Sequence, residues 1–215
     1  MEAILAEMLQ HKIVAILRGV QSTAILPAVE ALQRGGVRFV EVTYRPGSAA
    51  ANADTLRSIR LLRKKFGLSM HIGAGTVLTA ADVDDAYAAG AEYMISPNVN
   101  PEVIRRTKEL GLLSMPGAYT PTEAETAWEA GADIVMIFPA NQLGPGYFKA
   151  LKAPLCQLRL AAVGGVSEQN IGAFLAAGVD GFGIASALVN DDRVQREAWD
   201  EIERSARSYT EAVQV

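Results

Sequence analysis

The sequence lacks the features that mark several large classes of protein. It has one cysteine, Cys156, so no internal disulfide can form and no second thiol is available for a metal site. Such sparing use of cysteine is typical of a reducing, cytoplasmic compartment. Basic residues are outnumbered by acidic ones, and the formal net charge is −4. We therefore expect neither nucleic acid nor an anionic membrane surface as a partner.

Long hydrophobic runs are also absent. No apolar stretch approaches the roughly 18 residues that a membrane-spanning helix needs, so we expect no membrane segment. The first residues, from Met1 to Glu7, carry acids where a secretory signal would carry lysine or arginine. These observations predict a cytoplasmic location.

Histidine is scarce, and the two that are present suggest no metal site. His11 precedes the first predicted strand, and His71 lies early in the third. Glu41 is the one convincing acidic ligand at the end of a strand, and a single carboxylate cannot hold zinc or magnesium. We expect no metal and no cofactor.

The sequence does have an ordinary globular composition and a regular alternation of apolar segments with amphipathic helices. Half of its 215 residues are hydrophobic and a fifth are charged, which fits one domain spanning residues 1–215. Glycine recurs just before the apolar segments, as expected where a helix ends in a left-handed cap. The predicted strands cover about 13–17, 38–43, 69–74, 93–95, 112–115, 133–140, 159–163 and 180–184. The predicted helices cover about 2–10, 22–34, 49–65, 79–90, 101–111, 121–131, 145–152, 167–178 and 192–212.

Eight such strand–helix units predict a (β/α)8 TIM barrel that is preceded by a short N-terminal helix. In this interpretation Ser22 and Ser167 cap two of the helices. A doubly wound open sheet is the alternative. It has little support as a dinucleotide-binding fold, because no G-x-G-x-x-G motif follows the first strand.

In a barrel, functional residues gather at the carboxyl ends of the strands. Glu41 lies within an otherwise apolar strand, where burial would raise its pKa and suit it to general acid–base catalysis. The alternative is an ion pair with Arg18 or Arg45, which both follow strands at the same rim. Two guanidinium groups there fit recognition of a carboxylate or phosphate. Solvated loop arginines are the alternative interpretation.

A second group of residues follows the last two predicted strands. Gly164 and Gly165 precede a helix, and Ser186 follows the eighth strand. Backbone N–H groups in these loops of a barrel often bind an anion, so we expect a phosphate site here. Plain turn glycines are the alternative interpretation.

Several sequence blocks together resemble the KDPG/KHG aldolases, from about Ile13 to Val189. The blocks are Glu41-Val42-Thr43-Tyr44-Arg45, Gly73-Ala74-Gly75-Thr76-Val77, Ser96-Pro97, Pro116-Gly117, Thr120-Pro121-Thr122-Glu123, Phe138-Pro139-Ala140 and Gly164-Gly165. These class I aldolases cleave 2-keto-3-deoxy-6-phosphogluconate, and often 4-hydroxy-2-oxoglutarate, to pyruvate and an aldehyde. The resemblance implies a TIM barrel, a homotrimer or a larger assembly, and small keto acids as partners.

The resemblance also assigns roles to individual residues. Glu41 matches the general acid–base, Arg45 and Thr76 match residues that hold the carboxylate, and Arg18 lies at the same mouth. Gly164, Gly165 and Ser186 match the phosphate end, while Pro97 and Phe138 complete the expected substrate-binding set.

The main departure from the family pattern is Met136. The family has a lysine at this position of the sixth strand, whose amine forms an imine with the substrate ketone. A thioether cannot form an imine, and loss of a covalent nucleophile can cost on the order of 10⁶ in turnover. We therefore expect this chain to be impaired or inactive as an aldolase. Asn98 in place of glycine, and Ala162-Val163 in place of Pro-Thr, leave the preferred sugar acid open.

Two other functions remain open. The second candidate is a non-catalytic barrel that serves as a scaffold, a self-assembling subunit or a keto-acid-binding protein. A metal-dependent lyase that uses Glu41 is a third and poorly supported alternative.

Overall fold

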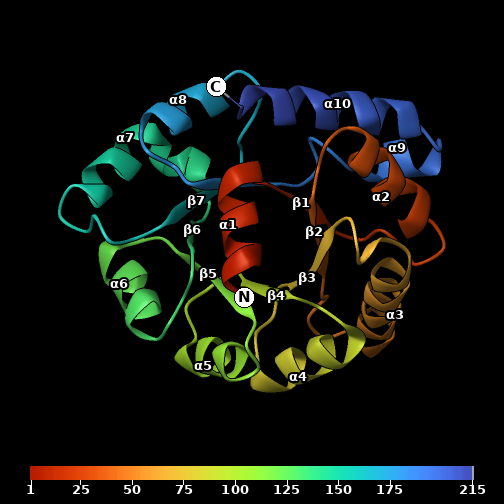
Figure 1. Cartoon of the computed structure of the whole chain (residues 1–215), viewed down its shortest axis with the longest axis horizontal. Coiled ribbons are helices and arrows are strands. Elements are labelled where there is room, and N and C mark those ends of the chain that lie inside the picture. Colours follow the sequence, from red (N-terminus) through yellow and green to blue (C-terminus); the bar gives the residue numbers. More distant parts are fainter. Residues whose placement is uncertain (215) are drawn as a thin grey trace.

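The computed structural model describes residues 1–214, which form a closed barrel of parallel strands surrounded by helices (Figure 1). Each strand pairs with the next one along the chain, and β1 pairs with β8 to close the ring. The strands are β1 (Ile13–Leu17), β2 (Phe39–Thr43), β3 (His71–Gly75), β4 (Tyr93–Ser96), β5 (Leu113–Ala118), β6 (Val135–Ile137), β7 (Leu160–Val163) and β8 (Gly181–Ile184). The predicted TIM barrel is confirmed, and the open doubly wound sheet is excluded.

Helices α2 to α8 alternate with these strands, and three further helices lie at the two ends of the chain. The helices are α1 (Glu2–His11), α2 (Ile25–Arg34), α3 (Ala49–Phe66), α4 (Ala80–Ala89), α5 (Pro101–Glu109), α6 (Pro121–Glu129), α7 (Ala140–Lys152), α8 (Ile171–Ala176), α9 (Asp191–Gln195) and α10 (Trp199–Ala212). The short N-terminal helix that the sequence predicts is therefore present as α1.

Two predicted helix caps are wrong. Helix α2 begins at Ile25 rather than near Ser22, whose N–H and hydroxyl both donate to the carboxylate of Asp54. A capping hydroxyl accepts from a backbone N–H of its own helix, whereas the hydroxyl of Ser22 is oriented as a donor to a charged acceptor on α3. Helix α8 likewise begins after Asn170, which accepts a hydrogen bond from the N–H of Ser167.

Several other predicted element bounds also differ from the structure. Strand β6 covers only Val135–Ile137, because the chain enters α7 directly after Pro139. Helix α7 is longer than predicted, with a non-helical residue at Gly144. The final helix is two helices, α9 and α10, separated by residues 196–198.

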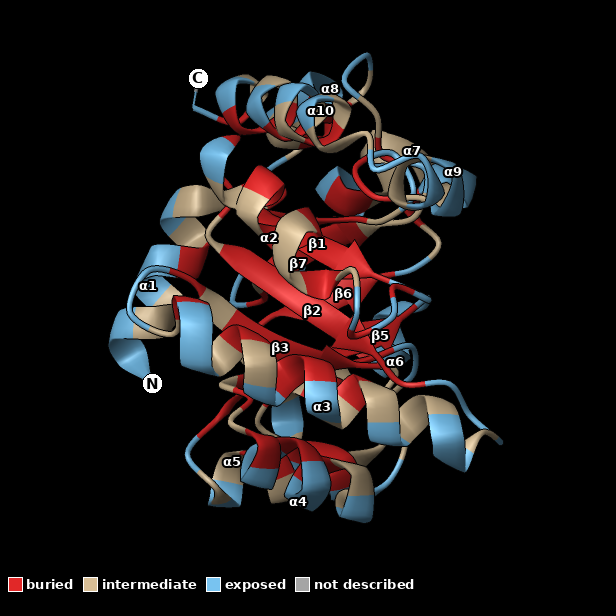
Figure 2. Cartoon of the chain, turned by 90° about the vertical axis from the view of Figure 1, so that its right-hand side faces the viewer, coloured by how far each residue is buried: buried red, intermediate tan, exposed pale blue. Residues whose placement is uncertain are grey.

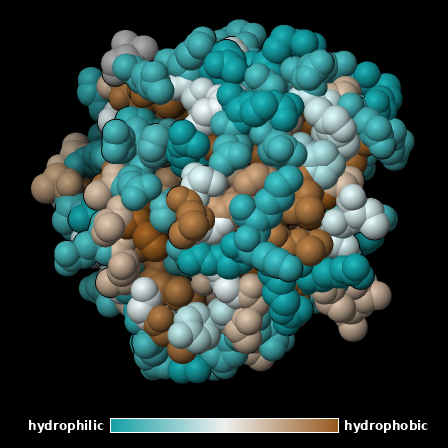
Figure 3. Space-filling view, turned by 45° about the vertical axis from the view of Figure 1, so that its right-hand side comes forward, coloured by the Kyte–Doolittle hydropathy of each residue, from teal (hydrophilic) through white to brown (hydrophobic). Residues whose placement is uncertain are grey.

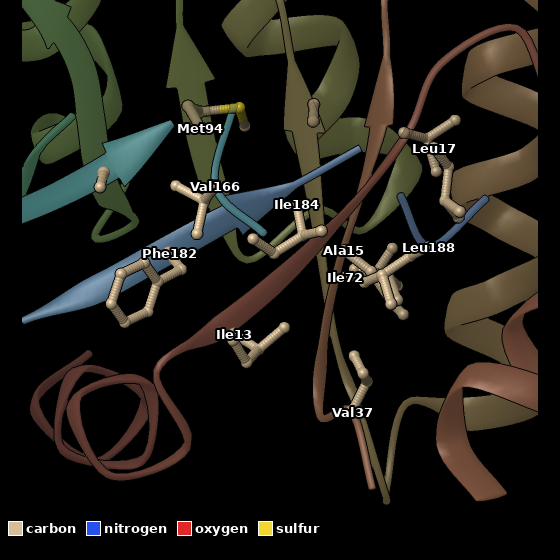
Figure 4. Close-up of a cluster of buried hydrophobic side chains, with 14 of the residues drawn as sticks. Ile13, Ala15, Leu17, Val37, Ile72, Met94, Val166, Phe182, Ile184 and Leu188 are labelled. Atoms are coloured by element: carbon tan, nitrogen blue, oxygen red, sulfur yellow. The ribbon is translucent and has the colours of Figure 1, made fainter. Parts of the chain in front are cut away.

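Side chains alternate between two apolar layers, as the period of two in a β-strand requires. One layer lies between the barrel and the helices and includes Ile13, Ala15 and Leu17 of β1. Figure 4 shows part of this layer, in which β1, β3, β4 and β8 contribute side chains beside loop residues Val37, Val166 and Leu188. The other layer fills the barrel and includes Val14, Phe39, Tyr93 and Met136. Figure 2 shows the buried strands between helices whose outer faces are exposed.

Helix α1 covers the amino-terminal mouth of the barrel, where it is seen in front of the strands in Figure 1. Its Met8 is 2% exposed and joins the apolar layer inside the barrel. The ring of His71 stacks on Phe39 and lies within hydrogen-bond distance of Glu7 on α1 and of Glu92. This mouth is therefore closed, and an open site can form only at the opposite end.

A repeated ion pair ties the amino ends of the strands to the surrounding helices. In each case a carboxylate just before an even-numbered strand accepts from a backbone N–H of the preceding odd-numbered strand and from a cation on a helix. The three sets are Glu92 with Ile72 and Arg63, Asp133 with Ser114 and Lys108, and Asp180 with Leu160 and Lys152. Each carboxylate thereby joins two strands and one helix at the closed end of the barrel.

The surface outside these contacts is mixed in character. On the face drawn in Figure 3, hydrophilic residues cover the upper edge, and hydrophobic patches lie between polar residues lower down. Within residues 1–214, no helix combines the length and the apolar character that crossing a bilayer requires.

The ion pair of Lys108 and Asp133 should contribute measurably to stability. Its atoms lie 2.6 Å apart, and the two side chains are only 22% and 13% exposed. Lys108→Met should lower the free energy of unfolding by about 1–3 kcal/mol, because it leaves a largely buried carboxylate without its cation. Arg196→Met on the exposed pair with Asp192 is the matched control, and solvent screening should make its effect smaller. Urea unfolding of both variants tests this, and equal losses would contradict it.

Candidate active site

An open hollow of about 390 Å³, with its mouth included, lies at the carboxyl ends of the strands. Its volume falls within the range of small-molecule sites. Residues from seven of the strands or the segments that follow them line it: Ile16, Arg18, Glu41, Thr76, Ile95, Ser96, Pro97, Gly117, Met136, Phe138 and Val163. The structure thus brings together Arg18, Glu41, Thr76, Pro97, Met136 and Phe138 from the set predicted from the sequence.

Glu41 is a buried ionisable group in the lining of this hollow. It is 2% exposed, and its register partners are Ile16 on β1 and Gly73 on β3. The hydroxyl of Thr43, two residues along the same strand and on the same face, lies 3.0 Å from Oε1 of Glu41 and donates to it. The same hydroxyl is also 3.3 Å from the carbonyl oxygen of Leu17. Thr43 therefore holds the carboxyl group in one orientation toward the hollow.

Burial raises the pKa of Glu41 to about 7 from an ordinary value of 4.5. The hydrogen bond from Thr43 and the charge of Arg18 oppose this rise but do not cancel it. The predicted alternative, an ion pair between Glu41 and Arg18 or Arg45, is wrong, since no cation lies within salt-bridge distance of Glu41 in residues 1–214. A carboxyl group with a pKa near neutrality can both accept and donate a proton at physiological pH.

The carboxyl group of Glu41 fits because its neighbour on β3 is a glycine. A Cβ atom at Gly75 would overlap the carboxyl of Glu41. Directly after it, Thr76 lines the hollow with a φ of 55°, which is rare for a β-branched residue. Strained backbone of this kind concentrates at functional sites, which supports a role for Thr76.

Met136 forms part of the apolar floor of the hollow. It is 2% exposed, and its side chain reaches toward Gly183 on β8. A Cβ placed on Gly183 would lie 3.2 Å from Cε of Met136, 3.0 Å from Cδ1 of Ile16 and 2.9 Å from Cγ2 of Val163. The glycine therefore makes room for three apolar side chains, and the floor carries no amine.

None of the chain's lysines lines the hollow. Lys108 and Lys152 are engaged in ion pairs at the opposite, closed end of the barrel. Lys12 follows α1 at that same end, and the others lie on α3 and α7: Lys64, Lys65 and Lys149. No lysine side chain within residues 1–214 can therefore place its amine where the side chain of Met136 lies.

Four residues of the predicted set lie outside the lining of the hollow. Arg45 is exposed at the rim, where its N–H donates to Asn52. Gly164, Gly165 and Ser186 lie in the loops after β7 and β8. Gly165 packs closely on Asn141, because a Cβ atom added to Gly165 would lie 2.4 Å from Cβ of Asn141. Their predicted roles in carboxylate and phosphate binding stay predictions.

Sequence reasoning missed the apolar part of the lining. Ile16 and Ile95 read as ordinary core residues, and Val163 was noted only as a departure from the family pattern. The available signal was the alternation along each strand, because these residues share the inward face with Glu41 and Met136. Within the described part of the chain, no group of three or more histidine, cysteine, aspartate or glutamate residues could hold a metal ion.

Comparisons with known proteins identify relatives over nearly the whole chain. The family model described as KDPG and KHG aldolase matches residues 4–205. The chain is 40% identical over 181 residues to a probable 2-dehydro-3-deoxy-6-phosphogalactonate aldolase of Rhizobium meliloti (strain 1021), covering 84% of this chain and 82% of that protein. It is 36% identical over 203 residues to the 2-dehydro-3-deoxy-6-phosphogalactonate aldolase of Escherichia coli (strain K12), covering 94% and 96%.

A solved structure shows the same fold with a ligand bound covalently. The crystal structure of KDPG aldolase from Legionella pneumophila, with pyruvate captured at low pH as a covalent carbinolamine intermediate, matches with a TM-score of 0.85 at 26% identity. The match covers 95% of this chain and 96% of that one.

The raised pKa of Glu41 makes a specific prediction about stability. The folded state binds this proton more tightly than the unfolded state, so the contribution is fully present below about pH 4.5 and is lost as the pH rises to about 7. The loss over that window should reach about 3 kcal/mol. Glu41→Gln should remove this dependence. Urea unfolding of both proteins between about pH 5 and about pH 8 measures it, and parallel pH profiles would contradict the prediction.

Proposed function

Since the chain belongs to the KDPG and KHG aldolase family, we propose that its hollow binds the keto acids that such aldolases cleave, and that Met136 removes the cleavage step. The ligands are pyruvate, 2-keto-3-deoxy-6-phospho sugar acids and 4-hydroxy-2-oxoglutarate. The observation that carries this proposal is the pairing of a buried Glu41 with an apolar Met136 at the carboxyl end of the barrel.

Cleavage in this class requires a lysine amine. The amine condenses with the substrate ketone and releases water, and the imine then accepts the electron pair of the breaking C–C bond. A general base takes the proton of the neighbouring hydroxyl as the aldehyde leaves. In the proposed arrangement Glu41 acts as the general base, and residue 136 occupies the position of the lysine amine. The chain therefore keeps the proton-transfer group and lacks the electron sink.

The side chain of methionine matches lysine as far as Cε. An amine at position 136 would extend one bond beyond the present Cε of Met136, which already lies in the lining of the hollow. The apolar neighbours Ile16 and Val163 would favour the neutral amine, which is the form that attacks a ketone. The site is thus shaped for a lysine that the sequence does not provide.

The ligand-binding roles form the finer part of this proposal. Arg18 and Thr76 line the mouth, where a guanidinium and a hydroxyl can bind a carboxylate. Arg45 is close by in sequence and exposed at the rim. Gly164, Gly165 and Ser186 would bind the phosphate through the loops after β7 and β8. The R. meliloti and E. coli relatives make 2-dehydro-3-deoxy-6-phosphogalactonate the first sugar acid to assay.

A binding or assembly role without catalysis is the second candidate, and Met136 is the observation that favours it. A neutral thioether fills the floor without reacting with a bound keto acid. Such a protein would retain ligand affinity and form the same homotrimer or a larger assembly.

Introducing the missing amine should restore the lyase reaction. We expect Met136→Lys to release pyruvate from 2-dehydro-3-deoxy-6-phosphogalactonate at least about 10³-fold faster than the parent chain, since a covalent nucleophile accounts for a large share of such catalysis. Borohydride should then trap a pyruvate adduct at residue 136. Met136→Gln is the matched control, with similar length and no amine. If Met136→Lys folds yet neither releases pyruvate nor forms an adduct, the proposal is wrong.

The assembly state is open to a direct measurement. We expect light scattering in solution to give three times the mass of one chain, as the family resemblance implies. A mass well above three chains would favour the self-assembling subunit, and a monomer would contradict both.

A further inference from the structure

We propose that the hollow binds a 2-keto acid together with one proton, which Glu41 takes up and donates as a hydrogen bond to the ketone oxygen of the ligand. This inference rests on the proposed keto-acid site and adds the protonation state in which that site is occupied. It assigns to Glu41 a function in an imine-free complex, in which the ligand stays non-covalent.

The charges around Glu41 show why a proton is needed. From β1 the facing cation is Arg18, which is exposed at the mouth, and from β4 the facing titratable group is the phenol of Tyr93. From β3 the neighbours are Gly73 and Gly75, which carry no charge. The floor at Met136 is apolar. Among these groups Arg18 is the cation that an ionised Glu41 and the carboxylate of a keto acid would have to share, so ionisation of Glu41 would leave a net negative charge in the hollow.

The hydrogen bonds of Glu41 leave one of its oxygens available. Oε1 accepts from Thr43, while Oε2 makes no hydrogen bond within residues 1–214. Tyr93 is occupied elsewhere, because its hydroxyl donates to the carbonyl oxygen of Val40 at 2.6 Å. The free carboxyl oxygen belongs to a residue that lines the hollow, so it is available to a ligand there.

The chemistry of the ketone selects the neutral form of the carboxyl group. A ketone oxygen only accepts hydrogen bonds. A carboxylate also only accepts, so it has no hydrogen to donate to the ketone. A neutral carboxyl group has one O–H to donate and no charge to repel the carboxylate of the ligand. Both effects favour the protonated state, and the raised pKa of Glu41 makes that state accessible near neutral pH.

The experiment is a titration of the parent chain with pyruvate, in which saturation-transfer NMR measures the binding. If only the neutral form of Glu41 binds, the apparent dissociation constant should be about tenfold higher at about pH 8 than at about pH 6. Calorimetry in two buffers of different ionisation enthalpy should show net proton uptake on binding at about pH 8. Equal affinities at the two pH values, or no proton uptake, would overturn the proposal.

Three variants separate the donated hydrogen bond from simple charge removal. Glu41→Gln keeps a neutral donor and should bind pyruvate with one affinity at both pH values, close to that of the parent at low pH. Glu41→Met has a similar length and no donor, so it should bind at least about fivefold more weakly than Glu41→Gln. Thr43→Val removes the hydrogen bond to Oε1 and should move the loss of binding to higher pH. Equal binding by Glu41→Gln and Glu41→Met would overturn the assigned hydrogen bond.

These outcomes are distinct from failure of the proposed function. A pyruvate adduct in Met136→Lys, together with pH-independent binding or no binding at about pH 6 in the parent chain, would retain the keto-acid site and reject the proton coupling. Absence of both the adduct and binding would reject both.

Discussion

Closure of the parallel strands into one hydrogen-bonded ring is the constraint on which the rest of the structure depends. Every strand between β1 and β8 has a neighbour on each side, so no edge is left unpaired. The ring also fixes the register, and the register decides which side chains point inward. Glu41 and Met136 share the interior because each lies on the inward face of its own strand, although they lie 95 positions apart in the sequence.

The two ends of the barrel then acquire different chemistry. At the amino end, α1 covers the mouth and carboxylates bind cations from the helices, so that Lys108 and Lys152 are held there. At the carboxyl end the loops leave a hollow whose polar groups are few. This separation matters for the chemistry, because a lysine fixed at the closed end cannot reach a ligand at the open one.

Inside the hollow, glycine positions and burial determine what Glu41 can do. Gly75 provides the space for its carboxyl group, and Gly183 provides the space for the apolar floor that includes Met136. Burial raises the pKa of Glu41, whereas the single hydrogen bond from Thr43 limits that rise. A carboxyl group with a pKa near neutrality therefore lies in the same hollow as an apolar floor that carries no amine.

The fold class, the order of the elements, and the residue types at the carboxyl end of the barrel can be predicted from the sequence. Apolar segments alternating with helices were sufficient for this, because hydrophobic periodicity is local and is repeated in every strand–helix unit. The sequence also singled out Met136 through the blocks that surround it, and the expectation that the family has a lysine there stays a prediction. Helix starts were less predictable: Ser22 bonds Asp54 on a different helix instead of capping its own, and no local pattern reports such a partner.

Which of the predicted residues share one hollow becomes known from the folded barrel and not from the sequence. It placed Arg18, Glu41, Thr76, Pro97, Met136 and Phe138 together, left Arg45 at the rim, and added Ile16, Ile95 and Val163 to the lining. It also decided that, within residues 1–214, Glu41 has a single hydrogen-bond partner and no ion pair. The physical reason is that distances between strands, burial and pKa values arise from contacts between segments far apart in the chain, which ring closure sets and the local sequence does not encode.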